Sequence, residues 1–142
     1  MRISFALFAD AANLSQEGKL NVLGVFDAVQ VAGLPTVHPR AHLVVRIKGG
    51  VSDVGTHVMT LRWVNPAGAE LWVSNGELNI GPPPPGLTDM DFPLIAAIDL
   101  PLDAPGTYAM QVMLDGTVHG EVKLHVRGEP MAIAAPVSGM VS

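Results

Sequence analysis

Histidine is the residue type in this chain with the most scope for metal chemistry, and five are present. His119 and Glu121 stand two positions apart, so on a β-strand both side chains point to one face, where a third ligand would complete a zinc site. The same two residues belong to an alternating polar series, which a solvated strand face explains without a metal. We therefore predict no metal site and keep His119 and Glu121 as candidates.

Aspartates near an expected loop are the second group of residues that could bind an ion. Asp89 and Asp91 are separated by one residue, and calcium sites collect several such oxygens from neighbouring loops. Two acids that bracket a turn also cap loops without an ion. A site at this loop end, with His38 beside the acids, is the basis of our alternative function: a small-ligand, calcium-binding or hydrolytic sandwich. Calcium-assisted membrane contact would use the same acids, but the chain lacks the basic residues that meet anionic lipid.

Residues for covalent catalysis are not arranged in a known motif. The chain has no cysteine, and none of its serines lies in a Gly-x-Ser-x-Gly elbow. No glycine-rich loop opens a helix that could hold a phosphate. We predict that the protein is not an enzyme and has no catalytic residue and no cofactor.

The composition favours association with protein rather than with nucleic acid. Charged residues make up 15% of the chain and hydrophobic residues 49%, whereas the usual charged share is about 25%. So little charge leaves the surface of a lone monomer short of polar cover, which favours contact with another subunit. The net charge is −5, and the eight lysines and arginines are scattered, so no basic stripe can displace counterions from phosphates. We predict a homo-oligomer or a protein partner, and no nucleic-acid binding.

The apolar runs of the chain are too short to span a bilayer. The first run, residues 3–9, follows Arg2 as in a secretory signal, but Ser4 interrupts it and Asp10 closes it. We interpret this run as the first strand of the domain. The expected protein is cytoplasmic and has no membrane span.

The elements that must position these side chains are β-strands. In residues 118–127 the even positions are apolar or glycine and the odd positions are polar, as in a strand with one face in a core. Strands are predicted at residues 2–13, 19–31, 41–48, 56–64, 69–79, 91–100, 107–113 and 118–127. Their spacing and the intervening turn residues predict an all-β fold: an antiparallel two-sheet β-sandwich of about eight strands, immunoglobulin-like or a related Greek key.

Two hairpins are specific enough to predict a register. A three-residue loop over residues 66–68 pairs Trp63 with Leu71 and places Arg62 opposite Trp72, where a cation–π contact could form.

In the last hairpin, a two-residue turn at Asp115-Gly116 would direct Gln111 to the core. A three-residue loop over residues 114–116 instead pairs Val112 with Val118 and keeps the apolar side chains on one face. We predict the three-residue loop. The preceding corner, residues 102–108, resembles the tyrosine corner of immunoglobulin-like sandwiches, although an ordinary core tyrosine at Tyr108 fits equally well.

Other segments depart from simple alternation. Residues 3–9 and 20–31 are apolar on both faces, which is typical of central strands or of a strand within an interface, and Gly24 suggests a bulge. The proline run over residues 81–87 predicts a stiff connection. We place the sandwich domain at residues 1–127. Residues 128–142 form a tail, either loosely ordered or docked on a neighbouring subunit, with interface candidates Met131, Ile133 and Val137.

Several blocks of the sequence resemble a known family. They are FALFADAAN at residues 5–13, GKLNVLGVFD at 18–27, LPTVHP at 34–39, PGTY at 105–108 and DG at 115–116. With these blocks the chain is similar to a family of small bacterial proteins catalogued only as a domain of unknown function. The resemblance extends to Arg127 and implies a stand-alone sandwich domain without an assigned activity, so no functional residues are carried over from it. Our leading interpretation is a non-enzymatic structural or protein-binding module that self-associates.

Overall fold

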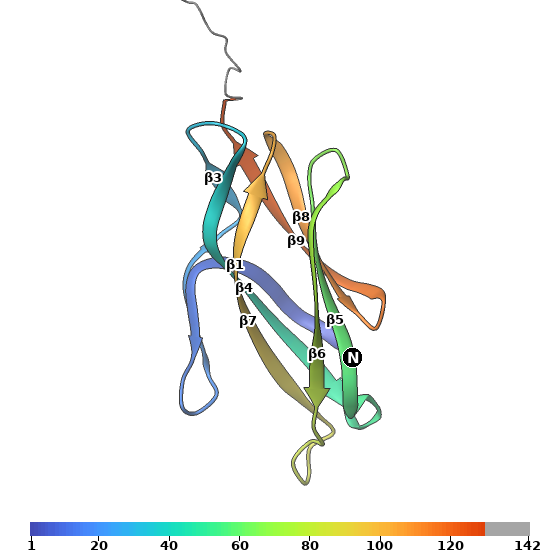
Figure 1. Ribbon diagram of the computed structural model, residues 1–142. Helices are drawn as coiled ribbons and strands as arrows, with labels where there is room; N and C mark the ends of the chain where they lie inside the picture. The colour runs from blue at the N-terminus through green and yellow to red at the C-terminus, as the bar shows by residue number, and fades with distance from the viewer. Residues whose placement is uncertain (130–142) are drawn as a thin grey trace, which may run out of the picture.

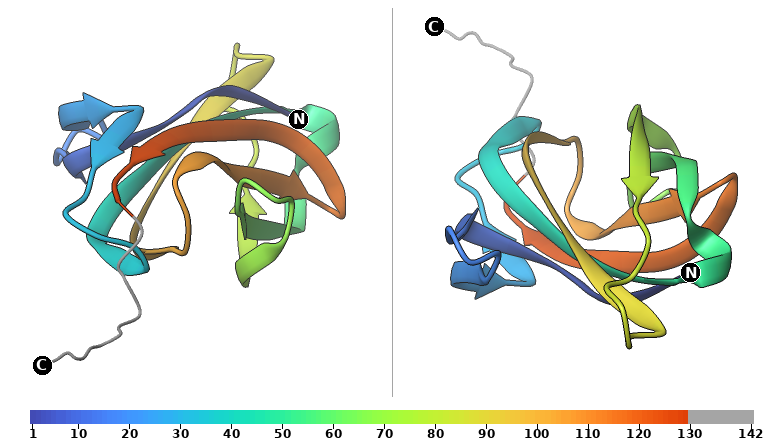
Figure 2. Two further views of the ribbon diagram at one scale, coloured as in Figure 1. Left: turned by 90° about the horizontal axis from the view of Figure 1, so that it is seen from above. Right: turned by 90° about the horizontal axis from the view of Figure 1, so that it is seen from below.

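The computed structural model describes residues 1–129 and consists of two β-sheets packed face to face (Figures 1 and 2). The strands are β1 (Arg2–Leu14), β2 (Leu20–Phe26), β3 (Ala28–Gln30), β4 (Thr36–Gly50), β5 (Gly55–Val64), β6 (Glu70–Ile80), β7 (Asp89–Leu102), β8 (Gly106–Leu114) and β9 (Thr117–Arg127). A short 3-10 turn, η1 (Val51–Asp53), follows β4. The predicted all-β sandwich is confirmed.

The strands are divided between a four-stranded and a five-stranded sheet. One sheet has the order β2-β1-β4-β7 and the other the order β3-β9-β8-β5-β6. The predicted strand at residues 19–31 is in fact two strands, because the chain leaves the first sheet after Phe26 and joins the second as β3, parallel to β9. Within residues 1–129 no helix is both long and apolar enough to cross a membrane.

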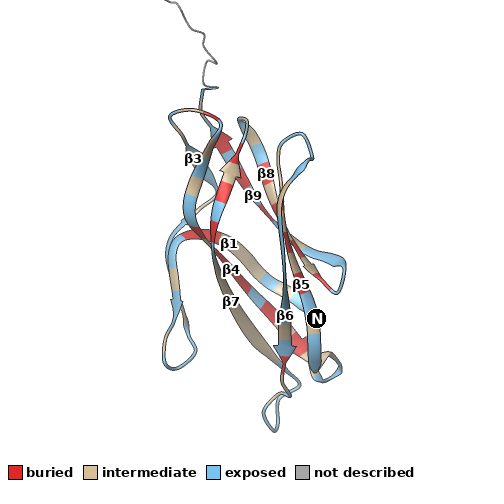
Figure 3. Ribbon diagram, in the orientation of Figure 1, coloured by how far each residue is buried: buried red, intermediate tan, exposed pale blue. Residues whose placement is uncertain are grey.

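The core lies between the sheets and is centred on aromatic side chains. Trp63 on β5 is fully buried and stacks on Tyr108 of β8, with ring centroids 5.2 Å apart. The rings of Phe8 and Trp63 are perpendicular, with centroids 5.9 Å apart, and the indole Nε1 donates a hydrogen bond of 2.9 Å to the Pro101 carbonyl. These contacts link strands of both sheets, and Figure 3 shows where buried residues lie along the strands.

The tyrosine corner is confirmed. The Tyr108 hydroxyl accepts hydrogen bonds from the backbone N–H groups of Asp103 and Ala104, both at 2.9 Å. Two acceptors lie within reach of its own proton, the Ala104 carbonyl at 2.6 Å and the Asp103 carboxylate at 2.7 Å. The hydroxyl therefore fixes the turn that leads from β7 into β8.

The register predicted for the last hairpin is wrong. Leu114 pairs with Thr117 across a two-residue turn, and Asp115 and Gly116 both have positive φ, as a type I′ turn requires. A bulge then leaves His119 without a partner, so Val112 pairs with Gly120 rather than Val118. The extra residue restores the apolar side chains of β9 to the core and turns Val118 outward, where it is half exposed.

In the β5–β6 hairpin, too, a bulge makes the observed register differ from the predicted one. The predicted loop is present, because the Asn65 N–H donates to the Ala69 carbonyl at 2.9 Å. A register shift then follows between Trp63 and Val64, so that Trp63 pairs with Trp72 instead of Leu71. Arg62 consequently lies opposite Val73 rather than Trp72, and its guanidinium binds Glu70 at 2.9 Å. The predicted cation–π contact is replaced by this ion pair.

The two early strands occupy different positions. β1 is central, between β2 and β4, whereas β2 forms the edge of its sheet. The predicted bulge at Gly24 is absent, since the β1–β2 register is continuous from Phe8 to Leu14. Gly24 is needed for another reason: its φ is +73°, and a Cβ there would collide with the Asp10 carboxylate.

Candidate functional site

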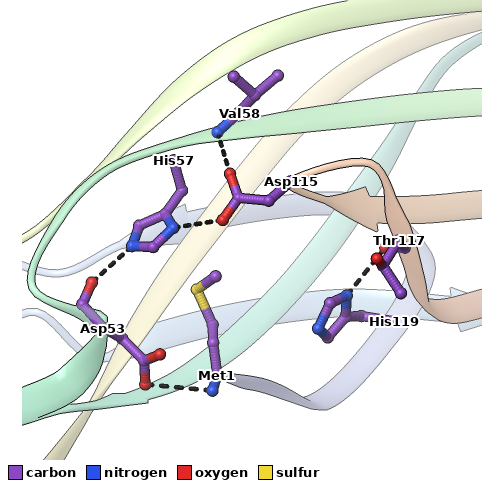
Figure 4. A network of polar contacts seen from close by, with 7 residues as sticks. All are labelled: Met1, Asp53, His57, Val58, Asp115, Thr117 and His119. Carbon is purple, nitrogen blue, oxygen red and sulfur yellow. Dashed lines mark hydrogen bonds and ion pairs between the residues drawn. The ribbon is translucent and has the colours of Figure 1, made fainter.

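A connected group of polar contacts lies at one end of the sandwich (Figure 4). His57, near the start of β5, has Nδ1 2.6 Å from an Asp115 carboxylate oxygen and Nε2 2.6 Å from the Asp53 carbonyl oxygen. The other Asp115 oxygen accepts the Val58 N–H at 2.9 Å. The imidazole therefore joins the β8–β9 turn to the end of η1.

The electrostatics of this group favour the charged form of His57. The hydrogen bond to Asp115 raises the pKa of His57, and the hydrogen bond to the Asp53 carbonyl raises it further. In return, the His57 hydrogen bond lowers the pKa of the Asp115 carboxyl. The pKa of Asp53 is also lowered, chiefly by the Gly50 N–H, which donates to its carboxylate at 2.9 Å. The Met1 amino group lies 3.1 Å from the same oxygen.

An imidazolium that donates from both nitrogens has no lone pair to accept a proton or bind a metal ion. In this arrangement His57 acts as a structural tie between two loops. Sequence reasoning missed the tie because His57 and Asp115 are 58 residues apart. They meet only through the pairing of β5 with β8, and neither residue carries a local signal of that pairing.

The zinc candidates His119 and Glu121 are occupied by local contacts. His119 is the bulge residue, and its Nδ1 lies 2.9 Å from the Thr117 carbonyl oxygen. Glu121 faces Lys123 on the same strand, at 3.8 Å. Among residues 1–129, no three histidine or acidic side chains are grouped so that they could hold a metal ion.

The residues of the alternative loop-end site are not brought together. His38 lies near the start of β4, where it pairs with Leu100 and its ring lies 5.4 Å from that of Phe26. Asp89 lies opposite Gly50, at the far end of the same strand. At about 3.3 Å per residue these two ends are roughly 40 Å apart, so His38 cannot join the aspartates in one site.

Asp91 is held by two cations of the neighbouring strand. Its carboxylate lies 2.7 Å from the Arg46 guanidinium and 3.6 Å from the Lys48 ammonium. A calcium ion at this position would have to displace both partners.

The candidates Met131, Ile133 and Val137 lie outside the described residues. The two residues that follow β9, Gly128 and Glu129, are described, and the Leu34 N–H donates a hydrogen bond of 3.1 Å to the Glu129 carbonyl.

A second feature is a hairpin that extends beyond the sandwich. β1 pairs with β4 only as far as Ala9, and residues 11–14 pair with β2 alone. We call residues 10–24, the outer part of this hairpin with its turn, the β1–β2 arm. It stands apart from the other strands in Figure 1 and is mostly exposed in Figure 3. Leu23 is 72% exposed and Leu14 47% exposed.

The edge formed by β2 lacks the features that protect the other sheet edges. β2 has seven residues, LNVLGVF, with no charge and no proline. Of the other edge strands, β3 has three residues, β6 carries two glutamates, and β7 carries three aspartates and two prolines. Short length, charge and proline are the usual means by which edges avoid pairing with other chains.

A groove of about 450 Å³ separates the tip of the arm from the outer face of its own sheet. Leu20 and Val22 line it from the arm, and Phe5 and Pro93 line it from the sheet. The arm therefore presents apolar side chains next to a hollow as well as an open strand edge.

Comparison with known proteins identifies a family but supplies no activity. The group described as Family of unknown function (DUF6941) matches residues 4–127. The chain belongs to this family. The resemblance seen in the opening blocks is thereby confirmed, and the matched region includes the β1–β2 arm and the His57 tie. No curated protein matches the sequence. Among solved structures, the chain is similar to an immunoglobulin-like protein from Pseudomonas aeruginosa, with 12% identity, a TM-score of 0.37, and coverage of 89% of this chain and 95% of that one.

Proposed function

We propose that this protein is a non-enzymatic β-sandwich module that binds protein through exposed sheet surface and self-associates. The observation that carries the proposal is the unprotected edge strand β2, with Leu23 72% and Val25 61% exposed on it. Backbone N–H and C=O groups on such an edge can pair with a further strand, and flanking apolar side chains add burial.

Two further observations support this proposal over an enzyme. His57 and Asp115 are the one close histidine–carboxylate pair among the described residues, and both nitrogens of that imidazole already face acceptors. Asp91, the acid best placed in a groove, is paired with Arg46 and Lys48. An enzyme would need such ionisable side chains to be free to react with a substrate. A protein-binding surface does not, so these pairings are compatible with binding.

The oligomeric state of the full chain tests the proposal. We expect native mass spectrometry and multi-angle light scattering to find an oligomer whose population rises with protein concentration. A mass equal to the monomer throughout the micromolar range would contradict self-association. In that case, affinity capture from the native cell extract would have to identify another protein that binds the chain directly. The cytoplasmic location stays a prediction, which fractionation of the native cell would test.

A further inference from the structure

We infer that the occupant of the β2 edge is a second copy of this chain, which pairs its own β2 antiparallel to the first along residues 20–23. This inference rests on the proposed self-association and assigns it a surface and a symmetry. The two four-stranded sheets would then join into one continuous sheet across the dimer.

The first argument is that the β1–β2 arm is incomplete as an isolated element. Its two strands pair only with each other from residue 11 outward, and a two-stranded hairpin in water is at best marginally stable. One inter-strand side-chain hydrogen bond supports it, from the Asn21 amide to the Asn13 amide oxygen at 3.0 Å. A third strand beside β2 would supply the missing backbone hydrogen bonds.

The second argument concerns which strand fits. Leu20, Asn21, Val22 and Leu23 carry no charge, so two copies can approach without repulsion between like charges. Gly24 has φ of +73° and interrupts the extended backbone, which limits the new pairing to the outer residues of the arm. Antiparallel pairing of this segment with itself would place leucines and valine of one copy beside those of the other, which is a favourable cross-strand contact.

The third argument is that β2 is the one edge strand, among the described residues, that lacks protection against pairing with another chain. The other edge strands within residues 1–129 are short, acidic or interrupted by proline. When identical edges meet around a two-fold axis, both are consumed and the assembly closes as a dimer. A chain with two open edges would instead extend into a filament.

The dimer contact must extend beyond the strand pair itself. A stable interface covers roughly 800 Å² on each partner, more than four paired residues supply. Part of this further apolar surface lies outside residues 20–23, at Leu14 on β1 and at Val25 on the inner part of β2, which are 47% and 61% exposed. We assign these two side chains to the same interface.

The test uses lysine substitutions on the full chain and sedimentation velocity over a range of concentrations. Leu23→Lys places a charge within the proposed contact, and the 72% exposure of Leu23 lets the monomer keep its fold. Val73→Lys is the matched control, because Val73 is a half-exposed residue on β6, the edge strand of the other sheet. We expect Leu23→Lys to raise the dimer Kd about tenfold or more and Val73→Lys to change it less than about twofold.

Cross-linking provides a second measurement that does not depend on destabilising the dimer. Because the chain has no cysteine, the single variants Leu23→Cys and Val73→Cys each carry one thiol. Antiparallel pairing along residues 20–23 places the two copies of residue 23 at opposite ends of the paired segment, roughly 10 Å apart, which is too far for a direct disulfide. A bismaleimide linker of that span should therefore cross-link the Leu23→Cys dimer much faster than the Val73→Cys dimer.

The outcomes separate this inference from the proposed function. A wild-type chain that stays monomeric overturns self-association as a whole. A wild-type oligomer that persists in Leu23→Lys, with equal cross-linking at both positions, leaves self-association standing and overturns the β2 interface. Masses that grow beyond the dimer overturn the closed two-fold arrangement.

Discussion

Replacing Tyr108 by phenylalanine would remove the hydroxyl that holds the corner between β7 and β8 while leaving the ring against Trp63. Two backbone N–H groups, those of Asp103 and Ala104, would lose their acceptor at 2.9 Å, and the Ala104 carbonyl would lose a donor. A net hydrogen bond contributes about 1 kcal/mol, and a buried group left without a partner costs more. Asp103 is exposed and Ala104 is half-buried, so water recovers part of the loss. We expect the free energy of unfolding to fall by about 2 kcal/mol.

The assay is equilibrium unfolding in urea or guanidinium, followed by tryptophan fluorescence. For a domain of this size the same loss corresponds to a fall in Tm of roughly 6 °C. Thr107→Val is the matched control, because it removes a hydroxyl from the neighbouring residue of the same strand, where Oγ1 contacts His125 at 2.9 Å on the exposed face. The control should change stability by less than about 0.5 kcal/mol. If the two variants are equally stable, the tyrosine corner does not hold the turn and the argument fails.

Two further predictions concern the His57 tie and a constrained glycine. Because the hydrogen bonds to Asp115 and the Asp53 carbonyl raise the folded-state pKa of His57, its stabilising contribution is complete below the unfolded-state pKa of about 6.5 and is lost as pH rises through the folded-state pKa. Unfolding titrations should show this alkaline decline in the wild type and in His42→Gln but not in His57→Gln; the same slope in all three would exclude the tie. Gly106→Ala should destabilise the fold by about 1–3 kcal/mol, since φ is +137° there and the new Cβ would lie 2.7 Å from the Pro66 ring. Gly76→Ala, which meets no atom within 4 Å, is the control, and equal melting temperatures for the two alanine variants would refute the steric argument.

The alternation of side chains made most strands predictable before any coordinates. In β9, Val122, Leu124 and Val126 are buried while the residues between them are exposed, because a strand places successive side chains on opposite faces. The same pattern identified β5 and β8. The tyrosine corner was one of two equal interpretations of residues 102–108, and the hydrogen bonds of the Tyr108 hydroxyl decided between them.

The register of each strand pair, and the sheet to which each strand belongs, were harder to predict from the sequence. The bulges at His119 and beside Trp63 shift the pairing by one residue, and a bulge leaves no mark in the alternation that distinguishes it from a longer loop. The division of residues 20–31 into β2 and β3 could not be predicted either, because a strand that is apolar on both faces has the same pattern in whichever sheet it lies. The His57 tie depends on three segments that only the packed sheets bring together.

The order of polar and apolar residues along the chain determined by itself that this protein is an all-β sandwich, because the two-residue period of a strand is a local property. Tertiary structure alone decided which strands became edges, and therefore that the uncharged strand β2 is unpaired on one side. An edge is defined by the absence of a neighbour, and the neighbour of a strand is chosen by contacts between residues far apart in the chain. For that reason the open edge of β2, on which the proposed function rests, could not be located from the periodicity of the sequence.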